Sequence, residues 1–80
     1  MTHPVQQPDP PAIYEIRLKG YLSSDWSPWF DDMVITHDDE NNTLLTGPVV
    51  DQAALHGLLD KVRDLGIPLL GVRNLPPKKV

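Results

Sequence analysis

His37 has the widest chemical possibilities of any residue in this sequence, because Asp38 and Asp39 follow it directly. An imidazole next to two carboxylates offers donor atoms that divalent cations accept. The other histidines do not extend this set, since no two have the four-residue spacing of a helical zinc site and none lies in an HExxH sequence. The acidic loop also departs from a calcium loop, with Thr43 where glycine is required and Val49 where a bidentate glutamate is required. We therefore expect neither a metal site nor a cofactor.

The residue patterns of covalent and acid–base catalysis are also missing. The chain contains no cysteine, no GxSxG elbow around a nucleophilic serine and no Gly-rich phosphate-binding sequence. Asp31 and Asp32 are adjacent, and because neighbouring side chains generally diverge they make a poor carboxylate pair for hydrolysis. We predict that the protein is not an enzyme.

Three of the five aromatic side chains stand close together, at Trp26, Trp29 and Phe30. With His37 beside it, such a cluster could line a groove for a small ligand. It could also seal one end of a small sheet as a satellite of the core. We expect the cluster to pack rather than bind, with Trp26 or Trp29 largely buried.

The charge and hydropathy of the chain limit its partners. The formal net charge of the 80 residues is −4 at pH 7, whereas nucleic-acid phosphates require a basic face, so we expect no nucleic-acid partner. Acidic side chains concentrate in residues 25–51, a stretch without lysine or arginine. No apolar run is long enough to span a membrane and no signal peptide pattern is present, so we expect no membrane partner and a cytoplasmic location.

The first elements follow from an alternating pattern and a helix cap. Residues 13–22 alternate between apolar and charged side chains, which predicts a strand with Ile16 and Leu18 toward the core and the charged residues toward water. Ser24 or Asp25 could then cap a short helix that carries the aromatic cluster on its inner face.

Two short β-rich runs, residues 33–37 and 43–47, are joined by five turn-forming residues. This pattern predicts a hairpin. A register that pairs Ile35 with Leu45 collects the larger apolar side chains on one face of the two strands.

A stripe of helical period comes next, made of Leu55, Leu58, Leu59, Val62 and Leu65. Asp51 is placed to cap this helix, and Gly66 is placed to end it in the left-handed conformation. Leu59 lies in the middle of the stripe and should be among the most buried residues. Residues 67–74 predict a last strand, with Pro68 tolerated at its start.

Together these elements predict an α+β domain, with a four-stranded, mostly antiparallel sheet and one long helix on one face. The order β-(short α)-β-β-α-β resembles the ferredoxin-like arrangement. The first connection is short enough to be an antiparallel corner instead of a parallel crossover, and the strand order stays open. The domain should span residues 13–75, with a Pro-rich disordered tail at 1–12 and a second tail at 76–80.

Three segments carry a resemblance to known sequences: WSPWF at residues 26–30, LTGPVVDQAALHGLL at 45–59 and VRDLG at 62–66. They are similar to a set of short, uncharacterised bacterial proteins of unknown function that share the WxxWF and LTGPVxDQAALHGLL segments. The resemblance covers roughly residues 13–73. It implies a stand-alone bacterial cytoplasmic domain, and it implies no activity and no catalytic residue.

Two functions of different classes remain. The first is a non-catalytic protein-interaction or self-associating module, because one helix can cover only one face of a four-stranded sheet. The possible interface with a protein partner or a homodimer partner consists of apolar residues assigned to the open face: Val34, Leu44, Ile67 and Leu69. The alternative is a small-ligand sensor or regulatory domain whose site is Trp26, Trp29, Phe30 and His37.

Overall fold

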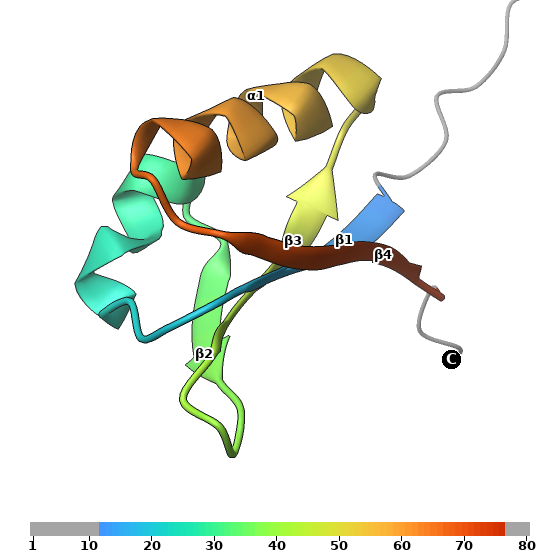
Figure 1. The fold of residues 1–80 in the computed structure, drawn as a ribbon. Coiled ribbons are helices and arrows are strands. Elements are labelled where there is room, and N and C mark those ends of the chain that lie inside the picture. The colour runs from blue at the N-terminus through green and yellow to red at the C-terminus, as the bar shows by residue number, and fades with distance from the viewer. Residues whose placement is uncertain (1–11, 77–80) are drawn as a thin grey trace, which may run out of the picture.

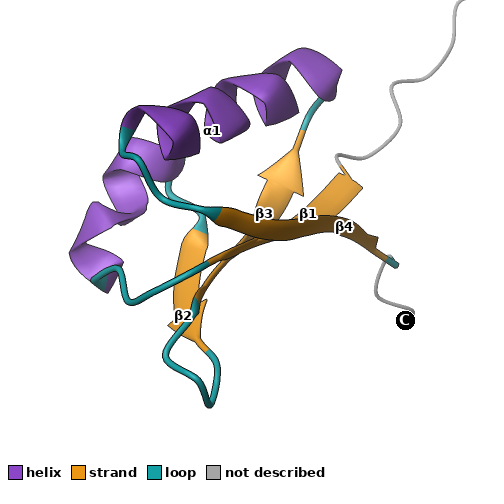
Figure 2. Cartoon of the chain, viewed as in Figure 1, coloured by secondary structure: helices purple, strands orange, loops and turns teal. Residues whose placement is uncertain are grey.

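A computed structural model describes residues 12–76, and its elements follow the predicted order (Figures 1 and 2). They are β1 (Ala12–Leu18), the 3₁₀ helix η1 (Ser24–Phe30), β2 (Val34–His37), β3 (Thr43–Val49), α1 (Gln52–Asp64) and β4 (Leu69–Leu75). The α+β class is confirmed, with a four-stranded antiparallel sheet and one long helix. The tails predicted at 1–12 and 76–80 lie outside the described residues except for Ala12, which belongs to β1, and Pro76.

The strands lie in the order β2-β3-β1-β4, and each neighbouring pair is antiparallel. β2 and β3 have the predicted register, with Ile35 opposite Leu45. Both β1 and β2 are antiparallel to β3 and therefore parallel to each other, so their connection is a parallel crossover, and not the antiparallel corner that its length also allowed. β1 ends at Leu18 rather than residue 22, close to Gly20 with its left-handed φ of +91°, and this leaves residues 19–33 to cross over β3.

One face of the sheet carries the core, and α1 and η1 cover it (Figure 2). The alternation along β1 places Ile16 and Leu18 on this face, where both are fully buried, as predicted. The other buried hydrophobic residues come from η1, β2, β3, α1 and the turn before β2: Phe30, Met33, Ile35, Leu45, Val49, Leu55, Leu58 and Val62. The hydrophobic stripe of α1 therefore joins the core strands, which is the arrangement that the helical period indicated.

Both ends of α1 are built as the sequence predicts. The Asp51 carboxylate accepts a hydrogen bond from the Ala54 backbone N–H at 2.8 Å, and Gly66 follows the helix with a φ of +73°. The expected burial of Leu59 is wrong, because Leu58 is buried and Leu59 is only partly buried. α1 packs against β3, and Leu59 lies on the side of the helix that points toward β4 and is less covered.

η1 differs from its prediction in its cap and in its inner face. Ser23, rather than Ser24 or Asp25, is the N-cap, and its hydroxyl accepts from the Asp25 backbone N–H at 3.1 Å. Phe30 is fully buried, whereas Trp26 and Trp29 are 40% and 44% exposed, so the shared inner face and the buried tryptophan are wrong. A 3₁₀ helix has about three residues per turn, so Trp26 and Trp29 fall on one ridge and Phe30 points away from it.

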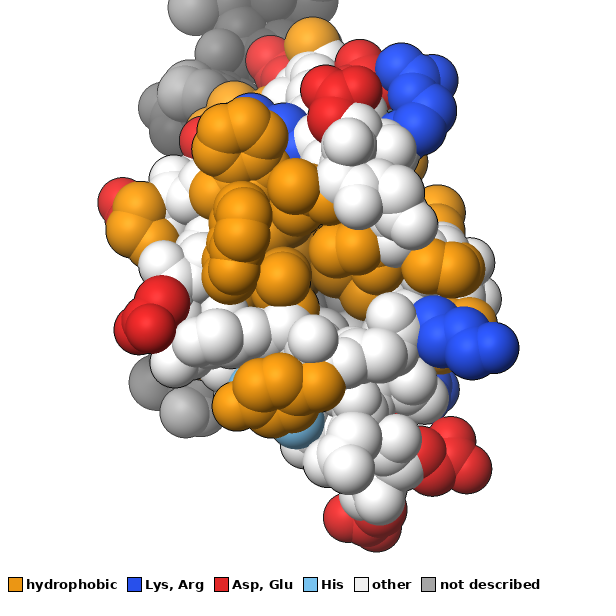
Figure 3. Space-filling model, turned by 60° about the vertical axis from the view of Figure 1, so that its left-hand side comes forward, with side chains coloured by type: hydrophobic (Ala, Val, Ile, Leu, Met, Phe, Trp, Pro, Cys, Tyr) orange, Lys and Arg blue, Asp and Glu red, His pale blue; other side chains and the backbone are white. Residues whose placement is uncertain are grey.

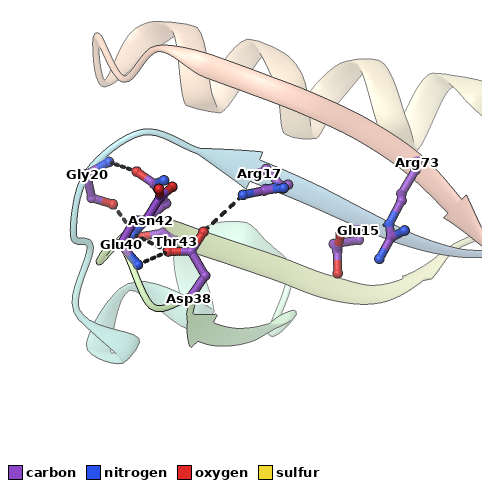
Figure 4. Close-up of polar contacts among 8 residues, drawn as sticks. All are labelled: Glu15, Arg17, Gly20, Asp38, Glu40, Asn42, Thr43 and Arg73. Atoms are coloured by element: carbon purple, nitrogen blue, oxygen red, sulfur yellow. Dashed lines mark hydrogen bonds and ion pairs between the residues drawn. The ribbon is translucent and has the colours of Figure 1, made fainter.

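Thr43 is a buried polar residue that ties the β1–η1 connection to the start of β3 (Figure 4). Its hydroxyl donates to the Gly20 carbonyl at 2.7 Å and accepts from the Leu22 backbone N–H at 2.8 Å. The neighbouring Asn42 side-chain oxygen accepts from the Gly20 N–H at 3.0 Å. These bonds satisfy backbone groups of a connection that has no strand partner of its own to bond them.

We expect Thr43→Val to lower the free energy of unfolding by about 1–3 kcal/mol, because valine leaves the Gly20 carbonyl and the Leu22 N–H without their partner. Thr43→Ser keeps the hydroxyl and should cost less. Urea unfolding of the two variants checks this, and a larger loss in Thr43→Ser than in Thr43→Val would mean that the methyl group of Thr43, and not its hydroxyl, is the main stabilising group.

Candidate functional site

The four residues predicted as an interface lie on two different sides of the sheet. Val34 and Leu44 are on the face away from α1, where Val34 is 61% exposed. Leu69 is the register partner of the buried Leu18, so it lies on the helix side, and Ile67 packs against the core there. These residues therefore form no single patch. Their placement together on the open face is wrong, and their role in an interface stays a prediction.

Paired charges occupy much of the open face (Figure 4). The Arg17 guanidinium lies 3.0 Å from the Asp38 carboxylate, and that of Arg73 lies 2.9 Å from the Glu15 carboxylate. The Arg73–Glu15 pair joins directly opposed residues of β4 and β1. This face therefore carries paired charges along β1 and β4.

β4 presents a different surface, because it is an edge strand with exposed apolar side chains. Leu69 and Leu70 are 47% and 49% exposed. Val72 is 37% exposed although its register partner, Ile16, is fully buried on the same face. The core-side face of β4 is thus less covered than that of β1, since α1 packs against β3.

A hollow of about 490 Å³ lies where the C-terminal half of α1 meets the start of β4. Its lining combines apolar and charged side chains with the turn that follows the helix: Leu59, Asp60, Val62, Arg63, Gly66, Ile67, Pro68 and Leu69. The hollow and β4 together make a continuous candidate site, which we call the β4 surface: the lining residues of the hollow and residues 69–75.

Hydrophobic side chains also gather on the face formed by η1 and the C-terminal end of α1 (Figure 3). The rings of Trp26 and Trp29 meet edge to face, with their centroids 6.4 Å apart. The Lys61 ammonium lies 5.8 Å from the centroid of Trp29 and 3.4 Å from the Asp31 carboxylate. Two of the four residues predicted as a ligand cluster are thus exposed together, while Phe30 belongs to the core.

His37, the fourth residue of that predicted cluster, is engaged by the β1–η1 connection. The Tyr21 ring stacks on its imidazole, with centroids 4.2 Å apart. Its Nε2 lies 2.7 Å from the Leu22 carbonyl oxygen, and because a carbonyl can only accept, Nε2 carries the hydrogen. Sequence reasoning missed Tyr21 by assigning it to the strand, although Gly20 just before it is a signal that the strand has ended.

The carboxylate beside His37 is used in building the turn. Within residues 12–76, no group of three His, Asp or Glu side chains is arranged to hold a metal ion. Asp38 accepts from the backbone N–H groups of Glu40 and Asn42, at 2.8 and 2.9 Å, and from Arg17. The N–H of Asn42 is the largest cause that lowers the pKa of the Asp38 carboxyl below its ordinary value; desolvation opposes it, and the bonds from Glu40, the Asn42 side chain and Arg17 add to it.

We expect Asp38 to make the protein acid-sensitive. Because its pKa is lowered in the folded state, its contribution to stability is present above the pKa of the unfolded chain and is lost as the pH falls through the folded value. The urea midpoint of the natural chain should therefore drop between about pH 5 and about pH 2 by more than that of Asp38→Asn. The same drop in both proteins would show that other carboxyl groups carry the acid sensitivity.

No helix in the described part of the chain is long and apolar enough to cross a membrane. Comparison with known proteins gives no match to a curated protein and none to a solved structure. One family model, a domain of unknown function (DUF8691), matches residues 13–73, which is well over half of the chain and includes every helix and almost all of the four strands. The chain therefore belongs to the DUF8691 family.

Proposed function

We propose that this protein is a non-catalytic protein-interaction module that binds a partner strand along β4. The observation that supports the proposal most directly is the exposure of Leu69, Leu70 and Val72 on an edge strand seven residues long. An edge strand offers a row of backbone N–H and C=O groups to which an extended segment can add. The net charge of −4 argues against a nucleic-acid partner.

The two edge strands of the sheet differ in length and in how far they are covered, and both differences favour β4 as the place where a partner strand adds. β2, at the other edge, is four residues long and has η1 packed against it. β4 is longer, its sequence LLGVRNL contains no proline, and its one charged side chain, Arg73, is bonded to Glu15 of β1. A partner strand would find more backbone groups and fewer obstacles at β4.

The hollow beside β4 supplies a place for side chains of the partner. Leu59, Ile67 and Leu69 offer apolar contacts, and the exposed guanidinium of Arg63 stands at the same site. In strand addition the main-chain bonds provide affinity, while pockets for side chains provide specificity. We propose that the hollow has this second role.

A direct test uses a peptide with the sequence LLGVRNL as an extended-strand probe, titrated into the isotope-labelled full chain. We expect saturable shifts of the amide signals of β4 and of the hollow, with a dissociation constant of about 1 mM or tighter. The same peptide methylated on every backbone nitrogen cannot donate along either edge and should bind more weakly. If the unmodified peptide produces no saturable shift in β4, strand addition is excluded as the mode of binding.

A small-ligand sensor or regulatory domain is the second candidate, and the exposed pair Trp26 and Trp29 favours it. The two rings and the Lys61 ammonium could bind a flat, anionic molecule. These are the two tryptophans of the chain, so their emission reports on the site directly. A saturable change of emission on adding a mixture of small aromatic acids would support the sensor, and an unchanged spectrum would remove it.

We also propose that the protein works in the bacterial cytoplasm, because its sequence segments resemble bacterial proteins and it contains no cysteine. Its fold is proposed to be a reduced ferredoxin-like variant. The element order and the strand order β2-β3-β1-β4 support this, with η1 in place of the first helix.

A further inference from the structure

We infer that the partner strand at β4 is the β4 of a second copy, paired antiparallel about a twofold axis that passes through Val72. The inference rests on the proposed function and names its partner. The resulting sheet would have eight strands, with both α1 helices on the same face. Such a closed twofold pair is the commonest form of a homo-oligomer, and it leaves no β4 edge free.

The position of Arg73 argues against one alternative register and fits the axis through Val72. An axis through Arg73 would place two guanidinium groups directly opposite each other, which is unfavourable. An axis through Val72 instead places each Arg73 opposite Gly71 of the other copy. Gly71 and Arg73 lie on the open face, since their register partners in β1 are Arg17 and Glu15. Each Arg73 can therefore keep its 2.9 Å bond to Glu15 of its own chain.

Gly71 is a second, independent feature that fits the pairing. Glycine in the middle of a strand weakens it and often marks a bulge or a close approach of another backbone. Gly71 adjoins the register shift at Leu70, but its φ is not positive and an added Cβ would meet no atom of residues 12–76 within 4 Å, so the bulge does not demand a glycine. In the proposed pair, Gly71 lies directly opposite Arg73 of the other copy, and without a side chain it allows the two β4 backbones to approach closely beside the axis.

On the helix side, the same axis brings apolar groups together. Val72 of one copy meets Val72 of the other on the face that carries Ile16, and the hollow with Leu59 and Leu69 lies next to it in each copy. The acidic turn between β2 and β3 belongs to the opposite edge of the sheet and stays away from the contact (Figure 1). The two acidic turns would therefore lie at opposite ends of the eight-stranded sheet.

The test uses the full chain and two matched pairs of variants. Val72→Glu places like charges on the axis, and Val34→Glu makes the same change at an exposed valine of the other edge strand. Sedimentation between about 10 µM and about 500 µM should show a monomer–dimer equilibrium, whose dissociation constant rises about tenfold or more in Val72→Glu and changes little in Val34→Glu. Circular dichroism of both variants verifies that they remain folded.

The second pair of variants introduces single cysteines and tests the register. The natural chain contains no cysteine, so each variant has only the introduced thiol to form a disulfide. Directly opposed residues of antiparallel strands are close enough for a disulfide, so Val72→Cys should form a covalent dimer under mild oxidation much faster than Val34→Cys. Equal rates, a stronger effect of Val34→Glu, or a chain that stays monomeric at about 500 µM would each overturn the inference. A monomeric chain that still binds the LLGVRNL peptide would overturn the self-pairing alone, whereas a chain that does neither would overturn the proposed function as well.

Discussion

Replacing Leu58 by alanine should lower the free energy of unfolding by about 2–5 kcal/mol, enough to unfold most of a domain this small. Leu58 is 2% exposed and belongs to the same core cluster as Leu55 and Val62 of α1 and the strands beneath them. Alanine would leave a cavity between α1 and the sheet, because the neighbouring core side chains prevent the helix from moving closer. Thermal or urea unfolding followed by circular dichroism measures the loss.

Two other positions of the same helix serve as controls. Leu59→Ala removes the same atoms from a partly buried site and should cost clearly less. His56→Ala changes an exposed side chain and should cost about 0.5 kcal/mol or less. If Leu59→Ala were as damaging as Leu58→Ala, Leu59 would have to be as buried as Leu58, and α1 would have to be rotated about its axis relative to the structure.

Phe30→Ala should be at least as damaging, with a loss of about 3–5 kcal/mol. Phe30 is fully buried at the end of η1, which packs against β2. Seven residues of 3₁₀ helix have little stability of their own, so this ring is the main attachment of η1 to the core. We expect the near-ultraviolet circular dichroism of the two tryptophans to weaken in the variant even under conditions in which the sheet persists.

Trp26→Ala is the matched aromatic control for Phe30. Trp26 is larger than Phe30 but much more exposed, so its removal should cost less despite the greater number of atoms lost. The opposite ranking would mean that the tryptophans, and not Phe30, attach η1. It would also restore the packed aromatic cluster that the sequence pattern suggested.

The parts of the fold that could be predicted from the sequence are those in which hydrophobic residues recur with a regular helical or strand period. The stripe of α1 and its Asp51 cap identify the helix, and the register of β2 and β3 follows from placing Ile35 opposite Leu45. η1 could not be placed correctly, because the spacing of its aromatic residues has opposite consequences in an α-helix and in a 3₁₀ helix. The sequence does not distinguish these two periods over seven residues.

The sequence shows that the last strand carries exposed apolar residues, but it does not show which face of the sheet each of them occupies. Between Arg17 and Leu18 the register with β4 shifts, so that Gly71 and Leu69 become successive partners and Leu70 is an additional residue. One extra residue reverses the alternation of faces, which moves Leu69 from the open face to the helix side. The mark that this bulge leaves in the sequence is Gly71 beside it, and because the alternating pattern alone takes no account of that glycine, it assigned Leu69 to the wrong face.

The most direct test of the β4 surface is the hydrogen exchange of its backbone amides, measured in the full chain at about 10 µM and at about 500 µM. In a single copy, the β4 amides that point away from β1 face solvent and exchange quickly. We expect their protection to rise with concentration, while that of the β2 amides, at the other edge of the sheet, stays constant. Protection in β4 that is independent of concentration, or that rises in β2 instead, would contradict the assignment of β4 as the contact strand between two copies.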